Sequence, residues 1–272
     1  MAYFERTGPT TFRPTPHVGG AWGPDEQHVA PALGLLAHVV ELDLRERRGG
    51  DLVVARLSYD ILGLLPLEEV EVAVAVVRPG RTVELVEATA SHGGRSAVRL
   101  RAWLLQRSDT AGLAGAAHPR LDPPEELVRW DGTVLWPGGF IASVEVRRSL
   151  VRPGRATSWV RTPHPLVEGE PVSDLARTAG LLDIANGLAV RVSPEEVAFP
   201  NVDLTAHLFR HPRAGWTGFD TSVSFGPDGV GVTSSVLHDA DGPFGTLAQV
   251  LTVRPGAVLP AVPVDGRGPT RS

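Results

Sequence analysis

The stretch LARTAGLLDIANGL, residues 175–188, decides the fold because it is an apolar helical run that contains a single carboxylate. Leu175, Ala179 and Leu182 recur at the spacing of one helical face, so we expect this face to be buried. The Ser-Asp pair just before the run is typical of a helix start, since a hydroxyl and an acid both favour the free N–H groups there. Gly187 is expected to end the helix.

The carboxylate of this run is Asp183, which lies between Leu182 and Ile184. It must therefore lie on or beside the buried face, where an unpaired charge is costly. Two interpretations stay open from the pattern alone. Asp183 is either a flanking residue with a solvent or capping contact, or a carboxylate kept in an apolar setting for its chemistry.

The segments on both sides of this helix follow the same order twice. An amphipathic helix ending at Gly49-Gly50 precedes strand-like runs at 52–62, 70–77, 82–91 and 96–105. In the second half, strands are expected at 140–150 and 155–162 before the helix, and at 202–210, 217–225, 230–238 and 245–253 after it. LSYDIL at 57–62 aligns with LTAHLF at 204–209, so the chain is an internal duplication. Helices followed by antiparallel strands predict an α+β fold.

Composition narrows the chemistry. The chain has no Cys, and all 26 basic residues are Arg. Disulfides, thiolate metal sites, Cys nucleophiles, Schiff-base lysines and phosphate loops that need a Lys are therefore excluded. No G-x-S-x-G stretch occurs, which argues against a nucleophile-elbow esterase. No spacing supports a metal site.

Charge and hydropathy give expectations about surroundings and partners. A net charge of −5 argues against a general binder of nucleic acids. The N-terminal residues lack a signal-peptide pattern, and no apolar run approaches the ~18 residues of a membrane span. We expect a soluble, cytoplasmic protein with no membrane span.

In this setting the chain resembles the double-hotdog acyl-CoA thioesterases, namely the thioesterase II family and related actinobacterial proteins. The resemblance extends over residues 10–255 and rests on the order and spacing of several stretches. These are WGPDEQHVAPALGLLA at 22–37, RPGRTVELVEA at 78–88, LVEGEPVSDLARTAGLLDIANG at 166–187, FPNVDLTAHLFRHPRAGW at 199–216 and LHDADGPFGTLAQVLTVR at 237–254.

The resemblance implies a double hotdog, in which two tandem antiparallel sheets each wrap around a central helix. We expect an N-terminal hotdog at 1–110, a linker at 111–136, and a C-terminal hotdog with the active site at 137–256. The Gly- and Pro-rich tail at 257–272 is expected to be disordered.

The resemblance also implies a catalytic set. Asp183 matches the family's catalytic Asp on the second helix. Gln249, five residues before Arg254, matches a Gln on the final strand. Asn201 stands where the family usually has Thr or Ser, although an amide can also donate and accept hydrogen bonds.

A second departure lies at the first helix, where the family often reads HGGP and this chain reads His28-Val29-Ala30-Pro31. A side chain in place of Gly obstructs close approach of a ligand to the backbone. Two interpretations stay open: Val29 restricts acyl binding at the first hotdog, or that half is purely structural.

The implied activity is hydrolysis of an acyl-CoA to a carboxylic acid and CoA, with neither metal nor cofactor. Asp183 would activate water, Asn201 and Gln249 would orient it, and backbone N–H groups near the start of the second helix or an adjacent loop would bind the oxyanion. Direct attack by Asp183 is less favoured. The alternatives are a hotdog dehydratase, whose residues do not match, and a non-catalytic acyl-CoA-binding or scaffolding protein. A homodimer or larger homo-oligomer is expected. The sequence does not give the acyl chain length, nor whether the acyl group is carried by CoA or by a carrier protein.

Overall fold

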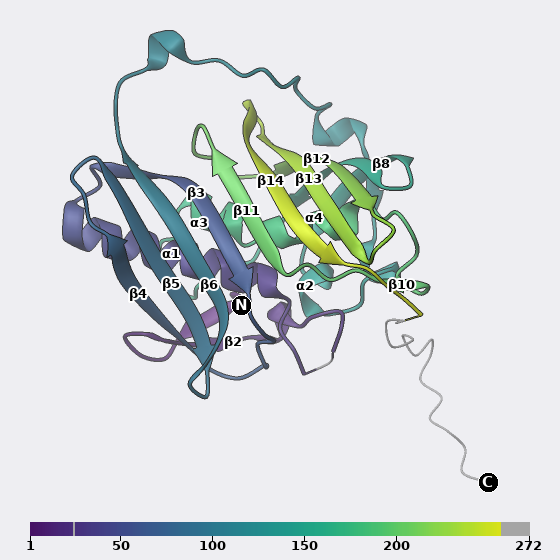
Figure 1. The fold of residues 1–272 in the computed structure, drawn as a ribbon, viewed down its shortest axis with the longest axis horizontal. Coiled ribbons are helices and arrows are strands. Elements are labelled where there is room, and N and C mark those ends of the chain that lie inside the picture. The colour runs from purple at the N-terminus through teal and green to yellow at the C-terminus, as the bar shows by residue number, and fades with distance from the viewer. Residues whose placement is uncertain (24, 257–272) are drawn as a thin grey trace.

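The computed structural model describes residues 1–23 and 25–256 and shows one large antiparallel sheet of 13 strands with the helices on one face (Figure 1). The strands follow the order β1-β2-β4-β5-β6-β3-β11-β14-β13-β12-β9-β8-β7. The first half contains β1 (Phe4–Arg6), β2 (Thr11–Pro14), η1 (Pro16–Val18), α1 (Val29–Arg48), β3 (Leu52–Ile61), β4 (Val70–Arg78), β5 (Val83–His92) and β6 (Arg95–Gln106).

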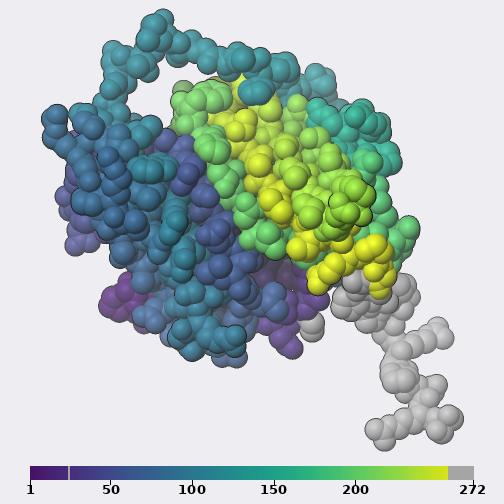
Figure 2. All heavy atoms as spheres, viewed as in Figure 1, coloured from purple at the N-terminus to yellow at the C-terminus, as the bar shows by residue number. Residues whose placement is uncertain are grey.

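The second half repeats this plan beside the first, as the purple-to-blue and green-to-yellow bodies of Figure 2 show. Before its helices it contains η2 (Ala111–Leu113), η3 (Pro124–Glu126), β7 (Val128–Trp130), η4 (Gly132–Val134), α2 (Gly139–Ala142), β8 (Glu145–Arg152) and β9 (Arg155–Arg161). The rest comprises α3 (Asp174–Ala179), η5 (Leu182–Ile184), α4 (Ala185–Leu188), β11 (Asp203–Leu208), β12 (Thr217–Phe225), β13 (Val230–Asp239), β14 (Gly242–Thr252) and a small sheet of β10 (Val197–Ala198) with β15 (Arg254–Pro255).

The two halves join where β3 pairs with β11. Ser58 lies opposite Thr205, and their hydroxyl oxygens are 2.9 Å apart. Leu57 and Tyr59 on one side face Ala206 and Leu204 on the other. These are equivalent positions of the two aligned sequences, so a local two-fold axis passes through the Ser58–Thr205 pair. The predicted duplication and the α+β double-hotdog fold are confirmed.

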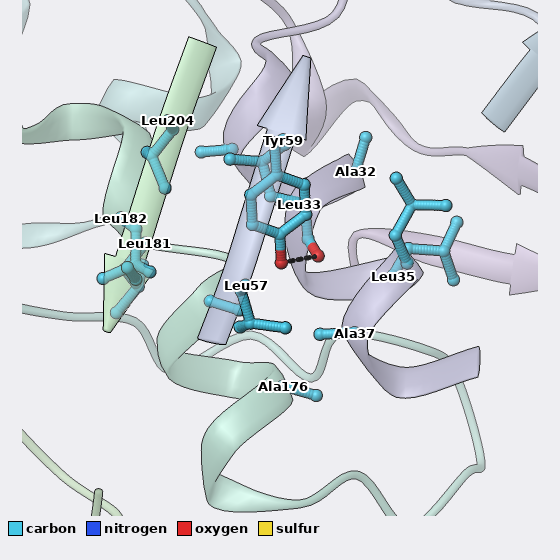
Figure 3. Packing of buried hydrophobic residues seen from close by; sticks show 14 of the residues in the cluster. Ala32, Leu33, Leu35, Ala37, Leu57, Tyr59, Ala176, Leu181, Leu182 and Leu204 are labelled. Atoms are coloured by element: carbon cyan, nitrogen blue, oxygen red, sulfur yellow. Dashed lines mark hydrogen bonds between the residues drawn. The ribbon is translucent and has the colours of Figure 1, made fainter. Parts of the chain in front are cut away.

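Helix α1 forms where the periodicity predicts it, and its ends have clear local causes. The His28 ring accepts a hydrogen bond from the backbone N–H of Ala30 at 3.2 Å, which caps the first turn. Gly49 ends the helix with a φ of 64°, a left-handed conformation that Gly adopts without strain. The Tyr59 hydroxyl of β3 donates to the carbonyl of Leu33 at 3.0 Å, which ties the buried helix to the sheet (Figure 3).

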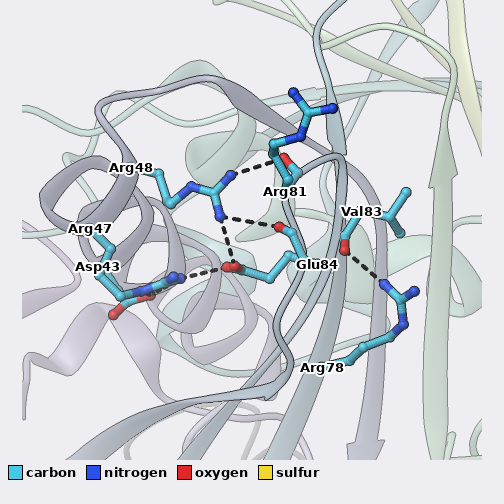
Figure 4. Close-up of polar contacts among 8 residues, drawn as sticks. Asp43, Arg47, Arg48, Arg78, Arg81, Val83 and Glu84 are labelled. Atoms are coloured by element: carbon cyan, nitrogen blue, oxygen red, sulfur yellow. Dashed lines mark hydrogen bonds and ion pairs between the residues drawn. The ribbon is translucent and has the colours of Figure 1, made fainter.

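The charged end of α1 is held to β5 by a partly buried cluster. The side chain of Glu84 is 2% exposed and lies between Arg47 and Arg48, as Figure 4 shows. Arg47 Nη2 is 2.8 Å from one Glu84 carboxylate oxygen and 2.7 Å from Asp43. A buried carboxylate is tolerated here because both of its oxygens face guanidinium groups.

The stretch 175–188 is not one helix, so this prediction is wrong in detail although the predicted buried face is correct. Helix α3 ends at Ala179, and the chain then makes the 3-10 turn η5 before α4. The break occurs at Gly180, where α1 crosses closely: a Cβ added to Gly34 would lie 2.8 Å from Gly180 N and from the Ala176 carbonyl oxygen. Ala37 and Ala176 are further small residues at this crossing (Figure 3). Gly180 favours the break because Gly stabilises helices poorly.

Two other local predictions need correction. Gly187 does not end a helix; it lies inside α4, and Trp136 packs on it, with the indole N–H donating to the Gly187 carbonyl at 3.2 Å. The predicted strand at 140–150 begins instead with the short helix α2. At its start, Gly139 lies so close to Pro16 that a Cβ would be 2.0 Å from the Pro16 carbonyl oxygen.

The connection between the halves begins after β6. Its first part, residues 107–120, is exposed and arches over the top of the molecule in Figures 1 and 2. Further along, β7 pairs with β8 and so belongs to the sheet of the second half. The boundaries at 110 and 136 stay predictions. The predicted disordered tail lies outside the described residues. Among residues 1–23 and 25–256, no helix is long and apolar enough to cross a membrane.

Candidate active site

Asp183 lies in the η5 turn, directly after the break in the second helix. Its side chain is 5% exposed, and its neighbours Leu182 and Ile184 are also buried. Because the turn replaces regular helix, Asp183 leaves the line of α3 and reaches the space between the helices and the sheet. A carboxylate at this depth must be held by hydrogen-bond donors or become neutral.

Two side-chain amides supply those donors. Asn201, in the chain just before β11, donates from Nδ2 to Asp183 Oδ1 at 2.6 Å. Gln249, on the inner face of β14 and 1% exposed, donates from Nε2 to the same oxygen at 3.1 Å. The structure therefore brings together all three residues of the predicted set. Since both amides bind Oδ1, Oδ2 is left available to a ligand.

With these contacts, both protonation states of Asp183 are populated near neutral pH. Burial raises the pKa of the Asp183 carboxyl to about 7, and the hydrogen bonds from Asn201 and Gln249 oppose this rise by favouring the charged form. A carboxylate with a pKa close to neutrality can both take up and return a proton at physiological pH.

Asp183 and Asn201 line one pocket of about 120 Å³ together with residues of the first half. One wall is the start of α1, where His28 and Val29 lie, and the lining also includes the exposed side chains of Trp22 and Leu64. The remaining lining residues are Gly20, Ala21, Glu26, Gln27, Ile61, Gly63, Leu65 and Pro200. The site is thus built between the two halves and is largely apolar apart from its amide, carboxylate and imidazole groups.

This arrangement bears on two expectations. The start of the second helix is not part of the Asp183 pocket; Asp174 lines a different pocket, with Tyr3 and Arg161. The helix start that faces Asp183 is that of α1. Val29 of the first half lines the same pocket as Asp183, so its side chain lies where it can restrict ligand binding at the candidate site.

His28 has a capping role in this wall. Its Nδ1 accepts from the Ala30 N–H, and burial lowers the pKa of the imidazole to about 4. The ring is therefore neutral near pH 7 and adds no positive charge opposite Asp183. Pro31 has no N–H and the Ala30 N–H is bound by His28, so among the first three residues of α1 the Val29 N–H is the donor without this cap.

Sequence reasoning did not identify the aromatic cluster that includes Trp22 of the pocket lining. Trp136 packs edge-on against Trp22 and Phe199, with ring centroids 5.7 and 5.6 Å apart. Trp136 is an aromatic residue in a region without periodicity, which indicates that it packs on another segment. Its partners could not be named from the sequence because they are distant along the chain. Within the described part of the chain, no three His, Asp or Glu side chains group as metal ligands would.

Comparison with known proteins agrees with this architecture. Solved structures similar to the chain include a protein of Novosphingobium aromaticivorans provisionally assigned as a thioesterase, with a TM-score of 0.71 and 21% identity over 93% of this chain and 99% of that one. A hot dog fold protein of Alicyclobacillus acidocaldarius has a TM-score of 0.70 and 14% identity, over 93% and 96%. Acyl-CoA thioesterase II TesB2 of Mycobacterium marinum has a TM-score of 0.65 and 17% identity, over 93% and 96%. At these identities the likeness shows the fold.

The family assignment comes from the sequence itself. No curated protein matches the chain closely enough to count as a relative. Residues 18–105 match the acyl-CoA thioesterase N-terminal domain, and residues 115–253 match the acyl-CoA thioesterase C-terminal domain. The chain belongs to the acyl-CoA thioesterase family.

Proposed function

We propose that the protein hydrolyses an acyl-CoA thioester to a carboxylic acid and CoA, with Asp183 as the general base. The observation that carries this proposal is the set of contacts around Asp183: a buried carboxylate, held by Asn201 and Gln249 through one oxygen, with a pKa raised to about 7 beside an apolar pocket. Family membership supports the same class of substrate.

The proposed reaction needs one carboxylate and one water molecule. Asp183 takes a proton from the water as its oxygen attacks the thioester carbonyl carbon, which gives a tetrahedral intermediate. The carbon–sulfur bond then breaks, and the departing sulfur takes the proton back from Asp183. The products are the carboxylic acid and the free thiol of CoA, and Asp183 is restored without a cofactor.

The start of α1 is suited to hold the substrate carbonyl. The Val29 N–H belongs to the first turn of a 20-residue helix, where free N–H groups and the helix dipole favour a developing negative charge. We place the thioester oxygen at this end of the pocket, opposite Asp183. The apolar side chains of Ile61, Leu65 and Pro200 would then contact the acyl group.

The amide of Asn201 can replace the hydroxyl of related proteins as a hydrogen-bond donor to Asp183. Its Nδ2 donates to Asp183 and also to the Asp203 carbonyl oxygen at 3.1 Å, so the amide plane is fixed at two points. The substitution therefore keeps the donor to the carboxylate. We propose that it is compatible with activity.

The non-catalytic alternative would be favoured by an Asp183 side chain directed away from Gln249. The 3.1 Å hydrogen bond between them does not have this geometry. We therefore place hydrolysis first, with acyl-CoA binding without turnover as the alternative. The expected homodimer or larger assembly and the cytoplasmic location stay predictions.

The test is release of thiol from a panel of acyl-CoA chain lengths, followed with a thiol-reactive dye. The protein has no Cys, so the dye reports product alone. We expect the unmodified protein to turn over substrate, and we expect kcat to fall by a factor on the order of 10²–10⁴ in Asp183→Asn. Saturable acyl-CoA binding without turnover in both proteins would overturn the hydrolase proposal. Acyl-carrier-protein thioesters in the same assay decide between the two carriers.

A further inference from the structure

The inner face of the second half-sheet is unusually polar below the Asp183 turn. Thr221 and Thr233 are both fully buried there, Ser235 is 4% exposed, and Gln249 is 1% exposed. Thr221 and Ser235 satisfy each other, with their hydroxyl oxygens 2.7 Å apart. Of these four residues, Thr233 and Gln249 remain.

Thr233 and Gln249 lie directly opposite each other on β13 and β14. Directly opposite residues share a face of the sheet and have Cβ atoms about 4.5–5.5 Å apart. Among the described residues, neither the Thr233 hydroxyl nor the Gln249 carbonyl oxygen Oε1 has a hydrogen-bond partner. Two buried polar atoms without partners on directly opposite residues are rare, because each loses its contact with water.

The internal duplication shows that the fold does not need these polar groups. Because Ser58 and Thr205 are equivalent, their partners Arg101 and Ala248 are equivalent too, and the next inward residues are Ala102 and Gln249. The strand partner of Ala102 is Val86, which therefore occupies the position of Thr233 in the first half. Val86 and Ala102 are fully buried and apolar. Only the half that carries Asp183 has the polar pair.

We propose that Thr233 is a positioning residue, whose hydroxyl holds the Gln249 carbonyl oxygen through one buried water and so keeps the Gln249 amide N–H directed at Asp183. The inference rests on the proposed function of Asp183. Without an anchor, the two ends of a Gln amide differ little in shape, and a rotated amide would direct Oε1 at the carboxylate. Buried polar groups that lack a protein partner are commonly bridged by an ordered water.

The variants separate positioning from packing. Thr233→Val keeps the shape of the side chain and recreates the Val86 environment, while Thr233→Ser keeps the hydroxyl. Thr221→Val is the matched control, because Thr221 is equally buried on the same face but bonds Ser235 and not Gln249. Each variant is first checked for a native circular dichroism spectrum.

Two readouts are used. The first is kcat and KM for acyl-CoA hydrolysis. The second is the side-chain amide NMR signal of Gln249, which is simple to assign because the chain has only three glutamines, Gln27, Gln106 and Gln249. The spectrum reports the amide even if no substrate is turned over, so it tests Thr233 independently of the proposed activity.

We expect Thr233→Val to lower kcat about 10- to 100-fold with KM changed less than about threefold, and to shift or broaden the Gln249 signal. Thr233→Ser should restore both, and Thr221→Val should alter neither. An unchanged Gln249 signal in Thr233→Val, or an equal change in Thr221→Val, would overturn the inference. An inactive unmodified protein whose Gln249 signal still depends on Thr233 would overturn the hydrolase proposal and keep the positioning contact.

Discussion

The Nδ2 atom of Asn201 lies 2.6 Å from Oδ1 of Asp183, although Asp183 lies in the η5 turn and Asn201 in the loop before β11. This hydrogen bond favours the charged carboxylate, whereas burial of Asp183 favours the neutral acid. The balance puts the pKa of Asp183 at about 7, inside the range over which an enzyme is assayed. Changes to this balance should therefore be visible in the pH dependence of turnover.

The first prediction concerns the unmodified protein. Since the general base must be deprotonated, kcat/KM should be constant above about pH 7 and fall about tenfold for each pH unit below it. Initial rates from pH 5 to 9 with one acyl-CoA provide the measurement, with circular dichroism at each pH as a check that the fold persists. A rate that stays constant down to pH 5 would contradict a base with this pKa.

The second prediction concerns Asn201. Asn201→Ala removes a hydrogen bond that lowers the pKa of Asp183, so the midpoint of the pH–rate profile should move to higher pH and the plateau rate should fall about tenfold or more. Asn201→Thr restores the hydroxyl of related proteins and should retain most of the rate, with a midpoint closer to that of the unmodified protein. If alanine leaves the midpoint in place, Asn201 does not act through Asp183.

The third prediction is a cost in stability. Because the pKa of Asp183 is higher in the folded chain than the ~3.9 of an unfolded Asp, its contribution to stability is complete below pH 4 and is lost as pH rises to about 7. The side chain of Asp183→Asn carries no charge at any pH. The free energy of unfolding of this variant, relative to that of the unmodified protein, should therefore rise by about 2–4 kcal/mol between pH 4 and pH 8.

Urea unfolding of both proteins at pH 4, 6 and 8 measures this difference. The comparison cancels the other carboxylates, which titrate in both chains. A gap that does not widen with pH would mean that Asp183 is not desolvated as the structure indicates. Greater stability with lost turnover is the pattern expected of a functional carboxylate.

How far the sequence predicts this molecule depends on the range of the contacts involved. Period-two and helical patterns are local, so α1, the strands of both halves and the duplication around Ser58 and Thr205 could be predicted. The convergence of Asp183, Asn201 and Gln249 was predicted only through resemblance, because nothing local connects a turn, a loop and a strand.

The features that were missed depend on contacts between distant segments. The end of α3 at Gly180 follows from its crossing with α1 at Gly34, and this crossing is visible only when both helices are placed. For the same reason, Val29 could not be assigned to the pocket of Asp183 from the sequence. The orientation of one half against the other sets both features.

The last prediction tests that crossing. In an ordinary helix Gly→Ala is favourable by about 1 kcal/mol, but a Cβ on Gly34 would lie 2.8 Å from three backbone atoms of Ala176 and Gly180. Gly34→Ala should therefore destabilise the protein by about 1–3 kcal/mol, since the backbones of α1 and α3 must move apart.

Gly112→Ala is the matched control, because a Cβ there would have no neighbour within 4 Å, and its stability should change by less than about 0.5 kcal/mol. Urea unfolding measures both variants. Since separation of the helices also displaces the turn that carries Asp183 from the Val29 wall, Gly34→Ala should lose turnover at temperatures where it is still folded. A Gly34→Ala protein as stable and active as Gly112→Ala would show that the break at Gly180 does not depend on the close approach of the two helices.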